Sequence, residues 1–200
     1  MKTRNLFIRI FGVGFMLALL TGCATTYNKQ SDSVVGINVP DRLKGGWTYS
    51  IDDSIKNARR NNFKPTSHIC SAHTFNLDAS ATLASALRKG MQEFLESGSE
   101  TNTAAGVKHV AFKLDSYQPR FNCSVGMAEP HCNGTAEVVI SVLVLMNGER
   151  KSFSVSTERS ADAAGGNLCV NALDAPADAT RKAAKDVVER AMERLLTVAK

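Results

Sequence analysis

A basic N-terminus followed by a short apolar run is the feature that most limits what this chain can form. Lys2, Arg4 and Arg9 come first, and an apolar run then covers residues 10–20. A helix that spans a bilayer needs about 20 apolar residues, so these eleven are too few to cross one. The pattern is typical of a secretory signal peptide, which is removed from the mature protein. We therefore expect residues 1–22 to be a signal peptide and the rest to fold outside the cytoplasm.

The apolar run ends in Leu20-Thr21-Gly22-Cys23. This tetrapeptide resembles the lipobox of bacterial lipoproteins, and the resemblance implies that the thiol of Cys23 is acylated and that the chain is cleaved before it. In this family an aspartate after the cysteine tends to retain the protein in the inner membrane, whereas Ala24 implies the outer membrane. Because two or more acyl chains hold a protein stably, we expect a lipid-anchored protein on the periplasmic side of the bacterial outer membrane. The alternatives are an ordinary signal peptide that happens to contain a cysteine and an N-terminal core helix.

The net charge argues against nucleic-acid binding. The full chain has 24 basic and 19 acidic residues, but three of the basic residues and none of the acidic ones lie in residues 1–22. The mature chain therefore has a net charge of about +2. A nearly neutral protein lacks the electrostatic attraction on which DNA and RNA binding depends, so we expect no nucleic-acid partner.

Four cysteines remain besides the lipidated Cys23, and an even number in an exported chain indicates two disulfides. Three pairings are possible. Cys123 and Cys132 enclose only eight residues, rich in turn formers, as a disulfide between adjacent strands would, and Cys70 then pairs with Cys169 by exclusion. The alternative is a metal site, with His68, Cys70, His73, Cys123, His131 and Cys132 as candidate ligands. Because the paired C-x₂-C spacing of structural zinc sites is missing, we expect disulfides and no metal.

The first part of the mature chain has no sustained hydrophobic period. Residues 23–46 contain few large apolar side chains and several turn formers, which predicts a lipidated cysteine followed by a flexible tether. A single domain is expected over residues 47–200. Alternating apolar and polar residues predict its first strand at 47–51 and its second at 67–75.

A helix is predicted after Asp78, which could cap it. Its apolar residues recur at helical spacing and are Leu83, Leu87, Met91 and Phe94. Gly90 inside this helix indicates close approach to a neighbour. Gly98 is expected to end the helix, and a loop is expected to follow.

Three strands and a second helix complete the predicted domain. Strands are predicted at 110–114, 135–146 and 153–157, and Asn147-Gly148 predicts a hairpin between the last two. Pro176 marks the first turn of an amphipathic helix whose exposed side has charges of both signs. This order predicts an α+β fold, a two-layer sandwich with a mostly antiparallel sheet of about five strands and both helices on one face.

The sequence contains none of the common catalytic motifs. There is no G-x-S-x-G, S-x-x-K or H-E-x-x-H pattern and no phosphate-binding loop. His68 and His73 would face opposite sides of a strand, His109 would begin a strand, and His131 lies between two cysteines. We therefore expect no catalytic residue, no cofactor and no enzymatic activity.

The predicted order of elements resembles that of small outer-membrane lipoproteins. The resemblance rests on the lipobox and on the passages HTFNLDASATLASALRKGMQEFLESG, LMNGERKSFSVSTERSADAAGG and DATRKAAKDVVERAMERLL. These are similar to the YajG-like family, and the layout also resembles that of the lipopolysaccharide-assembly lipoprotein LptE and of the auxiliary lipoproteins of lipid-transport systems. The resemblance implies, as an analogy of layout, a non-enzymatic accessory protein.

We therefore expect a lipid-anchored, periplasm-facing accessory or structural lipoprotein that binds another envelope protein. The uncovered sheet face or an exposed sheet edge would supply the binding surface. The first alternative is a lipoprotein that binds lipid or lipopolysaccharide, which predicts basic residues on the open sheet face or its rim. The candidates are Lys108, Lys113, Arg120, Arg150 and Lys151. The second alternative is an envelope enzyme, which requires histidines or carboxylates that converge in a pocket.

Overall fold

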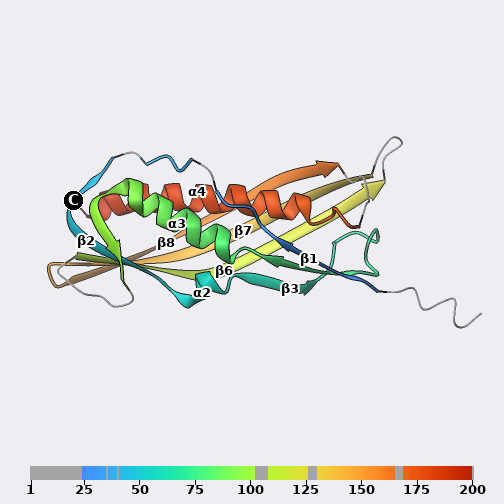
Figure 1. Ribbon diagram of the computed structural model, residues 1–200, viewed down its shortest axis with the longest axis horizontal. Coiled ribbons are helices and arrows are strands. Elements are labelled where there is room, and N and C mark those ends of the chain that lie inside the picture. Colours follow the sequence, from blue (N-terminus) through green and yellow to red (C-terminus); the bar gives the residue numbers. More distant parts are fainter. Residues whose placement is uncertain are drawn as a thin grey trace, which may run out of the picture.

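The computed structural model describes residues 24–34, 36–39, 41–101, 108–125, 130–164 and 169–199. The predicted signal peptide, the lipobox and Cys23 lie outside the described residues. Within these ranges the chain forms a five-stranded sheet, a three-stranded sheet and three helices. Two of the helices cover one face of the larger sheet (Figure 1). The α+β fold is therefore confirmed.

The larger sheet has the strand order β5-β2-β6-β7-β8. The strands are β2 (Leu43–Ile51), β5 (Leu95–Glu100), β6 (Lys108–Val125), β7 (Pro130–Met146) and β8 (Glu149–Ala164). The strands β6, β7 and β8 form the predicted antiparallel meander, but β2 runs parallel to both β5 and β6, so the sheet is mixed. Asn147 and Gly148 form the predicted hairpin turn with φ angles of 53° and 84°, which both residue types tolerate.

Two long helices, α3 (Ser80–Phe94) and α4 (Asp174–Val198), lie side by side on one face of this sheet (Figure 1). The Asp78 carboxylate accepts hydrogen bonds from the backbone N and Oγ of Ser80, at 2.9 and 2.6 Å, and so supports the first turn of α3. All four predicted apolar residues of α3 are buried. None of the described helices has both the length and the apolar composition needed to cross a membrane.

The predicted loop after the first helix is wrong. The helix α3 ends at Phe94 rather than near Gly98, and β5 follows directly. Only Leu95 of the six residues in β5 is buried, so its sequence has no strand-like alternation. Backbone pairing with β2 holds it in place, and a strand at the edge of a sheet needs little apolar surface of its own.

Small side chains let the helices approach their neighbours closely. The helix α4 packs against β7, β8 and α3, and its buried residues include Ala179, Ala183, Ala184 and Ala191. A Cβ added at Gly134 of β7 would lie 2.2 Å from the backbone nitrogen of Pro176. A Cβ at Gly90 of α3 would lie 2.6 Å from Cγ1 of Val188, which agrees with the close approach predicted for this glycine.

A second sheet, which the sequence analysis did not predict, has the order β1-β4-β3. Its strands are β1 (Thr26–Gln30), β3 (Arg59–Phe63) and β4 (Thr74–Asp78). Its core is aromatic: Phe75 packs edge-on against Phe121 of β6, with 4.9 Å between ring centroids, and Phe63 contacts both rings. The strand predicted at 67–75 is therefore mostly wrong, because residues 67–73 form bends and turns before β4.

The predicted flexible tether is wrong for its described residues. The strand β1 pairs in parallel with β4, and the Oγ of Ser31 donates a hydrogen bond to the carbonyl of Ala177 at 3.0 Å. Val34 and Ile37 are buried in the main core. These partners are far away in the sequence, so a local pattern could not reveal them. The folded domain therefore begins at β1 and not at residue 47.

Both disulfides lie at the end of the molecule that contains the second sheet. Cys123 and Cys132 are register partners on β6 and β7, so their bond crosses the antiparallel ladder. Cys70 and Cys169, 99 residues apart in sequence, join the turn region before β4 to the segment before α4. A disulfide of this kind stabilises a domain by about 2–4 kcal/mol. Because all four cysteines are in disulfides, they are not free to act as ligands of the alternative metal site.

We predict that Gly134→Ala lowers the free energy of unfolding by about 1–3 kcal/mol, because the new methyl group would meet the rigid backbone of Pro176. The control is Gly46→Ala, where a Cβ meets no atom within 4 Å and the change should stay within about 0.5 kcal/mol. Urea unfolding followed by the fluorescence of Trp47, the single tryptophan, measures both. Equal stabilities for the two variants would contradict the close packing of α4 on β7.

Candidate functional site

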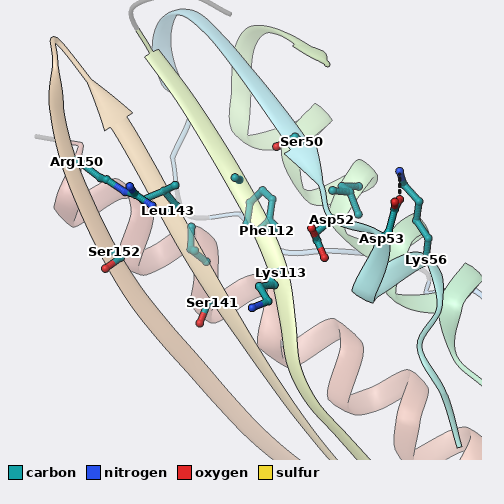
Figure 2. A pocket seen from close by; sticks show the side chains of 13 residues that line it. Ser50, Asp52, Asp53, Lys56, Phe112, Lys113, Ser141, Leu143, Arg150 and Ser152 are labelled. Carbon is teal, nitrogen blue, oxygen red and sulfur yellow. Dashed lines mark hydrogen bonds and ion pairs between the residues drawn. The ribbon is translucent and has the colours of Figure 1, made fainter. Parts of the chain in front are cut away.

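A hollow lies on the open face of the five-stranded sheet, opposite α4 (Figure 2). It has a volume of about 580 Å³ and crosses β2, β6, β7 and β8 near the ends of these strands that lie far from the disulfides. The short helix α2 (Asp53–Lys56) borders one side. We call this hollow the groove.

Strand register places the side chains that line the groove. Ser50 pairs with Ala111, Ala111 with Leu143, and Leu143 with Ser152, so one row runs across four strands. Since side chains alternate between the faces of a strand, these four point away from the helices. Hydroxyl groups therefore stand at both ends of the row, and apolar side chains lie between them.

Two cations lie beside this row. Lys113 is the register partner of Ser141, and Figure 2 shows its side chain extending towards that residue. Arg150 reaches from β8 over Leu143 of β7 (Figure 2). No ion pair of Lys113 or Arg150 is found within the described residues. Their charges are therefore available to an anionic group of a ligand.

Acidic residues stand on the α2 side of the groove. Asp53 forms an ion pair with Lys56 at 3.0 Å. Asp52 accepts a hydrogen bond from the backbone N of Ser54 at 2.8 Å, and the hydrogen bonds from Ser54 together with the charge of Lys113 lower the pKa of Asp52 below its ordinary value. The groove therefore has acidic residues on its α2 side and two cations elsewhere, Lys113 on β6 and Arg150 on β8.

His109 lies between two hydroxyl groups next to the groove. Its Nδ1 is 2.8 Å from Oγ1 of Thr48, and its Nε2 is 3.0 Å from Oγ of Ser50. The side chain is 2% exposed, and burial lowers its pKa below the ordinary value. A neutral imidazole can donate to one hydroxyl and accept from the other, so this histidine ties β2 to β6.

The hydroxyl of Ser50 and Nε2 of His109 are as close as a catalytic serine and its base would be. Among the described residues, the other parts of a hydrolytic site are not found beside them. The second ring nitrogen meets the hydroxyl of Thr48 rather than a carboxylate. Ser50 lies within β2, and the backbone N–H groups of a strand point along the plane of the sheet, so none projects from the face to stabilise an oxyanion. The arrangement is suited to holding two strands together.

The other three histidines lie at the opposite end of the molecule. Nδ1 of His73 accepts a hydrogen bond from the backbone N of Thr25 at 3.3 Å, and Nε2 of His131 is 3.3 Å from the carboxylate of Asp162. His68 is exposed. None of these histidines lines the groove or lies near His109.

The five basic candidates separate into two groups. Lys113 and Arg150 line the groove. Lys108 lies over the ring of Trp47, Lys151 donates to the backbone carbonyl of Val198 at the end of α4, and Arg120 donates to Gln118. Sequence reasoning missed the hydroxyl side chains Ser50, Ser141 and Ser152. Ser141 could have been found, because it interrupts an otherwise apolar face of β7.

Lowering the pH should destabilise the protein through His109. Because its pKa is lower in the folded state, the unfolded chain, with a histidine pKa of about 6.5, binds a proton first. The free energy of unfolding therefore decreases as the pH falls below about 6.5. It stops decreasing once the pH is below the pKa of His109 in the folded protein. We predict that wild type loses more stability than His109→Gln between pH 7.5 and 5.5, measured by urea unfolding. A constant difference between the two proteins would contradict a neutral, buried imidazole.

No family model matches the chain, and no curated protein sequence matches it. Among solved structures, a Xanthomonas campestris protein of the DUF330 family is 14% identical, with a TM-score of 0.43 over 88% of this chain and 97% of the other. A "putative lipoprotein" from Caulobacter crescentus CB15 is 10% identical, with a TM-score of 0.34 over 60% and 81% of the two chains. An uncharacterized protein is 9% identical, with a TM-score of 0.38 over 88% and 99%. Likeness this distant carries no information about function.

Proposed function

We propose that this chain is a lipid-anchored accessory protein of the bacterial cell envelope, without enzymatic activity, that binds an envelope protein in the groove. The observation that carries the proposal is the composition of the groove, in which an apolar strip is flanked by hydroxyl groups and by two cations, Lys113 and Arg150, that have no ion pair in the described part of the chain. Lipidation of Cys23 and location on the periplasmic side of the outer membrane are parts of the same proposal and rest on the lipobox.

The chemistry of the groove favours an acidic segment of a partner protein. Lys113 and Arg150 would meet carboxylates of the partner, and charge complementarity of this kind supplies orientation and specificity. Leu143 and Ala111 would contact apolar side chains, because contact surfaces combine an apolar centre with a polar rim. Asp52 and Asp53 on the α2 side would disfavour an anion there and so fix the direction of the segment.

The free edge of β8 is less suited to binding a strand. Arg194 donates from Nη1 to the carbonyl of Ser154 at 2.6 Å, and Arg190 donates from Nη1 to the carbonyl of Ser156 at 3.4 Å. These arginines of α4 already occupy carbonyl groups that an added strand would need. Covering an edge with charged side chains is a common way in which proteins prevent strand pairing. The open face, rather than this edge, therefore supports the proposal.

Binding of lipid or lipopolysaccharide is a second candidate function. Lys113 and Arg150 lie together above an apolar strand face, as the lipid alternative predicted for basic residues on the open side. A phosphate head group would meet these cations, and part of an acyl chain would lie along Leu143. Mass spectrometry of lipids that co-purify with the protein from membranes distinguishes this candidate from the first.

Charge reversal in the groove tests the protein-binding proposal. We predict that Lys113→Glu combined with Arg150→Glu lowers the yield of a crosslinked envelope partner from intact cells by at least about tenfold, because attraction becomes repulsion. Arg120→Glu is the matched control, since Arg120 is exposed on β6 outside the groove. A Cys23→Ala variant tests whether the anchor is needed. If the double variant recovers the partner as well as the control does, the groove is not the binding site.

Labelling with a fluorophosphonate, which reacts with activated serines, tests the proposed lack of enzymatic activity. We expect the wild-type protein to remain unlabelled, because the contact of Ser50 with His109 lacks an orienting carboxylate and an oxyanion site. Ser50→Ala is the control. Labelling of wild type that disappears in Ser50→Ala would overturn the non-enzymatic part of the proposal.

A further inference from the structure

We propose that the end of the domain that carries Thr25, Val125 and Val170 rests directly on the surface of the bilayer in which Cys23 is anchored. The inference rests on the proposed lipidation of Cys23. It goes beyond the proposed function because it assigns a membrane-contact surface and an orientation.

The first argument is the length of chain between the anchor and the fold. The backbone N of Thr25 donates to His73, and its carbonyl accepts a hydrogen bond from the backbone N of Thr74 at 3.1 Å. Thr25 is thus already held in the folded domain, two residues after Cys23. Two residues reach at most about 7 Å. A lipidated Cys23 would therefore hold this end of the domain at the level of the lipid head groups, with no tether to separate them.

The second argument is that the exposed apolar side chains lie at the same end. Among the described residues the large apolar side chains that are exposed are Val125, at 66%, and Val170, at 54%. Val125 lies two residues after Cys123, whose backbone N donates to Oγ of Ser67 at 3.1 Å. Val170 follows Cys169, which is bonded to Cys70. These bonds connect both valines to the turn region 66–73, which leads to Thr74 at the start of β4, the strand that pairs with β1.

Figure 1 shows the same arrangement. The start of β1, the connection between β3 and β4, the end of β6 and the end of β8 all lie at one end of the elongated domain, and the C-terminus lies at the other. A bilayer at this end would be contacted by turns and strand ends rather than by a helix or a sheet face. The valines would enter the interface between head groups and acyl chains, where exposed apolar side chains are favourable.

The third argument is the distribution of charge along the domain. Residues 66–73 contain no aspartate, glutamate, lysine or arginine, although the side chain of Lys64 donates from Nζ to the carbonyl of Ser71 at 3.1 Å. At the opposite end, the turn after β7 is followed by Glu149, Arg150 and Lys151, and Lys108 begins β6. A turn without full charges loses little solvation at a lipid surface, whereas the charged end is suited to water. A bilayer therefore fits the end with the valines better than the other end.

The orientation holds the groove away from the membrane. Lys113 and Val125 are twelve residues apart on β6, which corresponds to roughly 40 Å along a strand. A lipid seated in the bilayer of the anchor would therefore not reach Lys113. The ligand of the groove would come from the periplasmic side, as a protein segment or as a lipid already taken out of a membrane.

The experiment places a tryptophan at each end of the lipidated, full-length protein. Val125→Trp and Ser152→Trp are both surface positions, the second in the groove, and the native Trp47 is present in both as a buried background. Each protein is incorporated into vesicles of phosphatidylethanolamine and phosphatidylglycerol, with or without brominated acyl chains. We expect the bromines to lower the added fluorescence of Val125→Trp roughly twofold and to leave Ser152→Trp unchanged, because interfacial groups enter about 5–10 Å.

Two further measurements distinguish failure of this inference from failure of the proposed lipidation. Flotation of the vesicles shows whether the protein is membrane-bound, and mass spectrometry shows whether Cys23 carries a lipid. If the protein floats with lipidated Cys23 but Val125→Trp is not quenched, the domain stands away from the bilayer and the inference is wrong, while the proposed anchoring remains. A blue shift without bromine quenching would mean that a second copy of this protein covers this end, and would also overturn the inference. If Cys23 carries no lipid, the proposed anchoring itself fails. Val125→Trp combined with Val170→Asp should reduce the quenching, which a chance collision with lipid would not explain.

Discussion

The packing of α4 on the β6–β7–β8 meander is the contact on which the rest of the structure depends. One face of β7 presents Val138, Ile140, Val142 and Val144, each at most 1% exposed. Burying such a strip is the main favourable contribution to folding. The alanine-rich side of α4 and Gly134 allow the helix to lie close to this strip. Asp186 of α4 binds Arg159 of β8 at 2.7 Å and also accepts a hydrogen bond from Thr157, which fixes the helix along the sheet.

Because α3 and α4 cover only one face of the sheet, the other face is open, and this is the face for which we propose binding. The open side of β7 has half-buried apolar residues, among them Leu143 and Leu145. In a sheet with one solvent-exposed face, polar residues would be expected at these positions. The hydroxyl of Ser141 and the charge of Lys113 interrupt this surface at one place. The groove therefore combines two features that purely structural surfaces seldom share, an apolar strip and cations that lack ion pairs in the described part of the chain.

Sequence reasoning succeeded where the determining contacts are local. Asn147-Gly148 sets its turn by its own φ angles, and the apolar spacing from Leu83 to Phe94 shows one face of α3. It failed for β1 and β5, whose strands exist through backbone pairing with partners that are distant in the sequence. In the groove, Lys113 and Arg150 were named as candidates from charge alone. Ser50 and Ser152 were not, because only the register of four strands brings them into one row.

Because the folded domain begins at β1, the N-terminal segment has a structural role that its amino-acid composition did not suggest. Its polar residues form β1 and pack beside α4, where Lys29 binds Asp174 at 2.6 Å. Under the proposed lipidation of Cys23, anchoring and folding would be coupled, because a force on this residue would act on a strand of the second sheet. That sheet is joined to the meander by the ring of Phe121, and Cys70–Cys169 joins the turn region before its strand β4 to the segment before α4. If Cys23 carries the proposed lipid, a domain fixed in this way would have little freedom to reorient on it, and the fold itself would set the direction in which the groove faces.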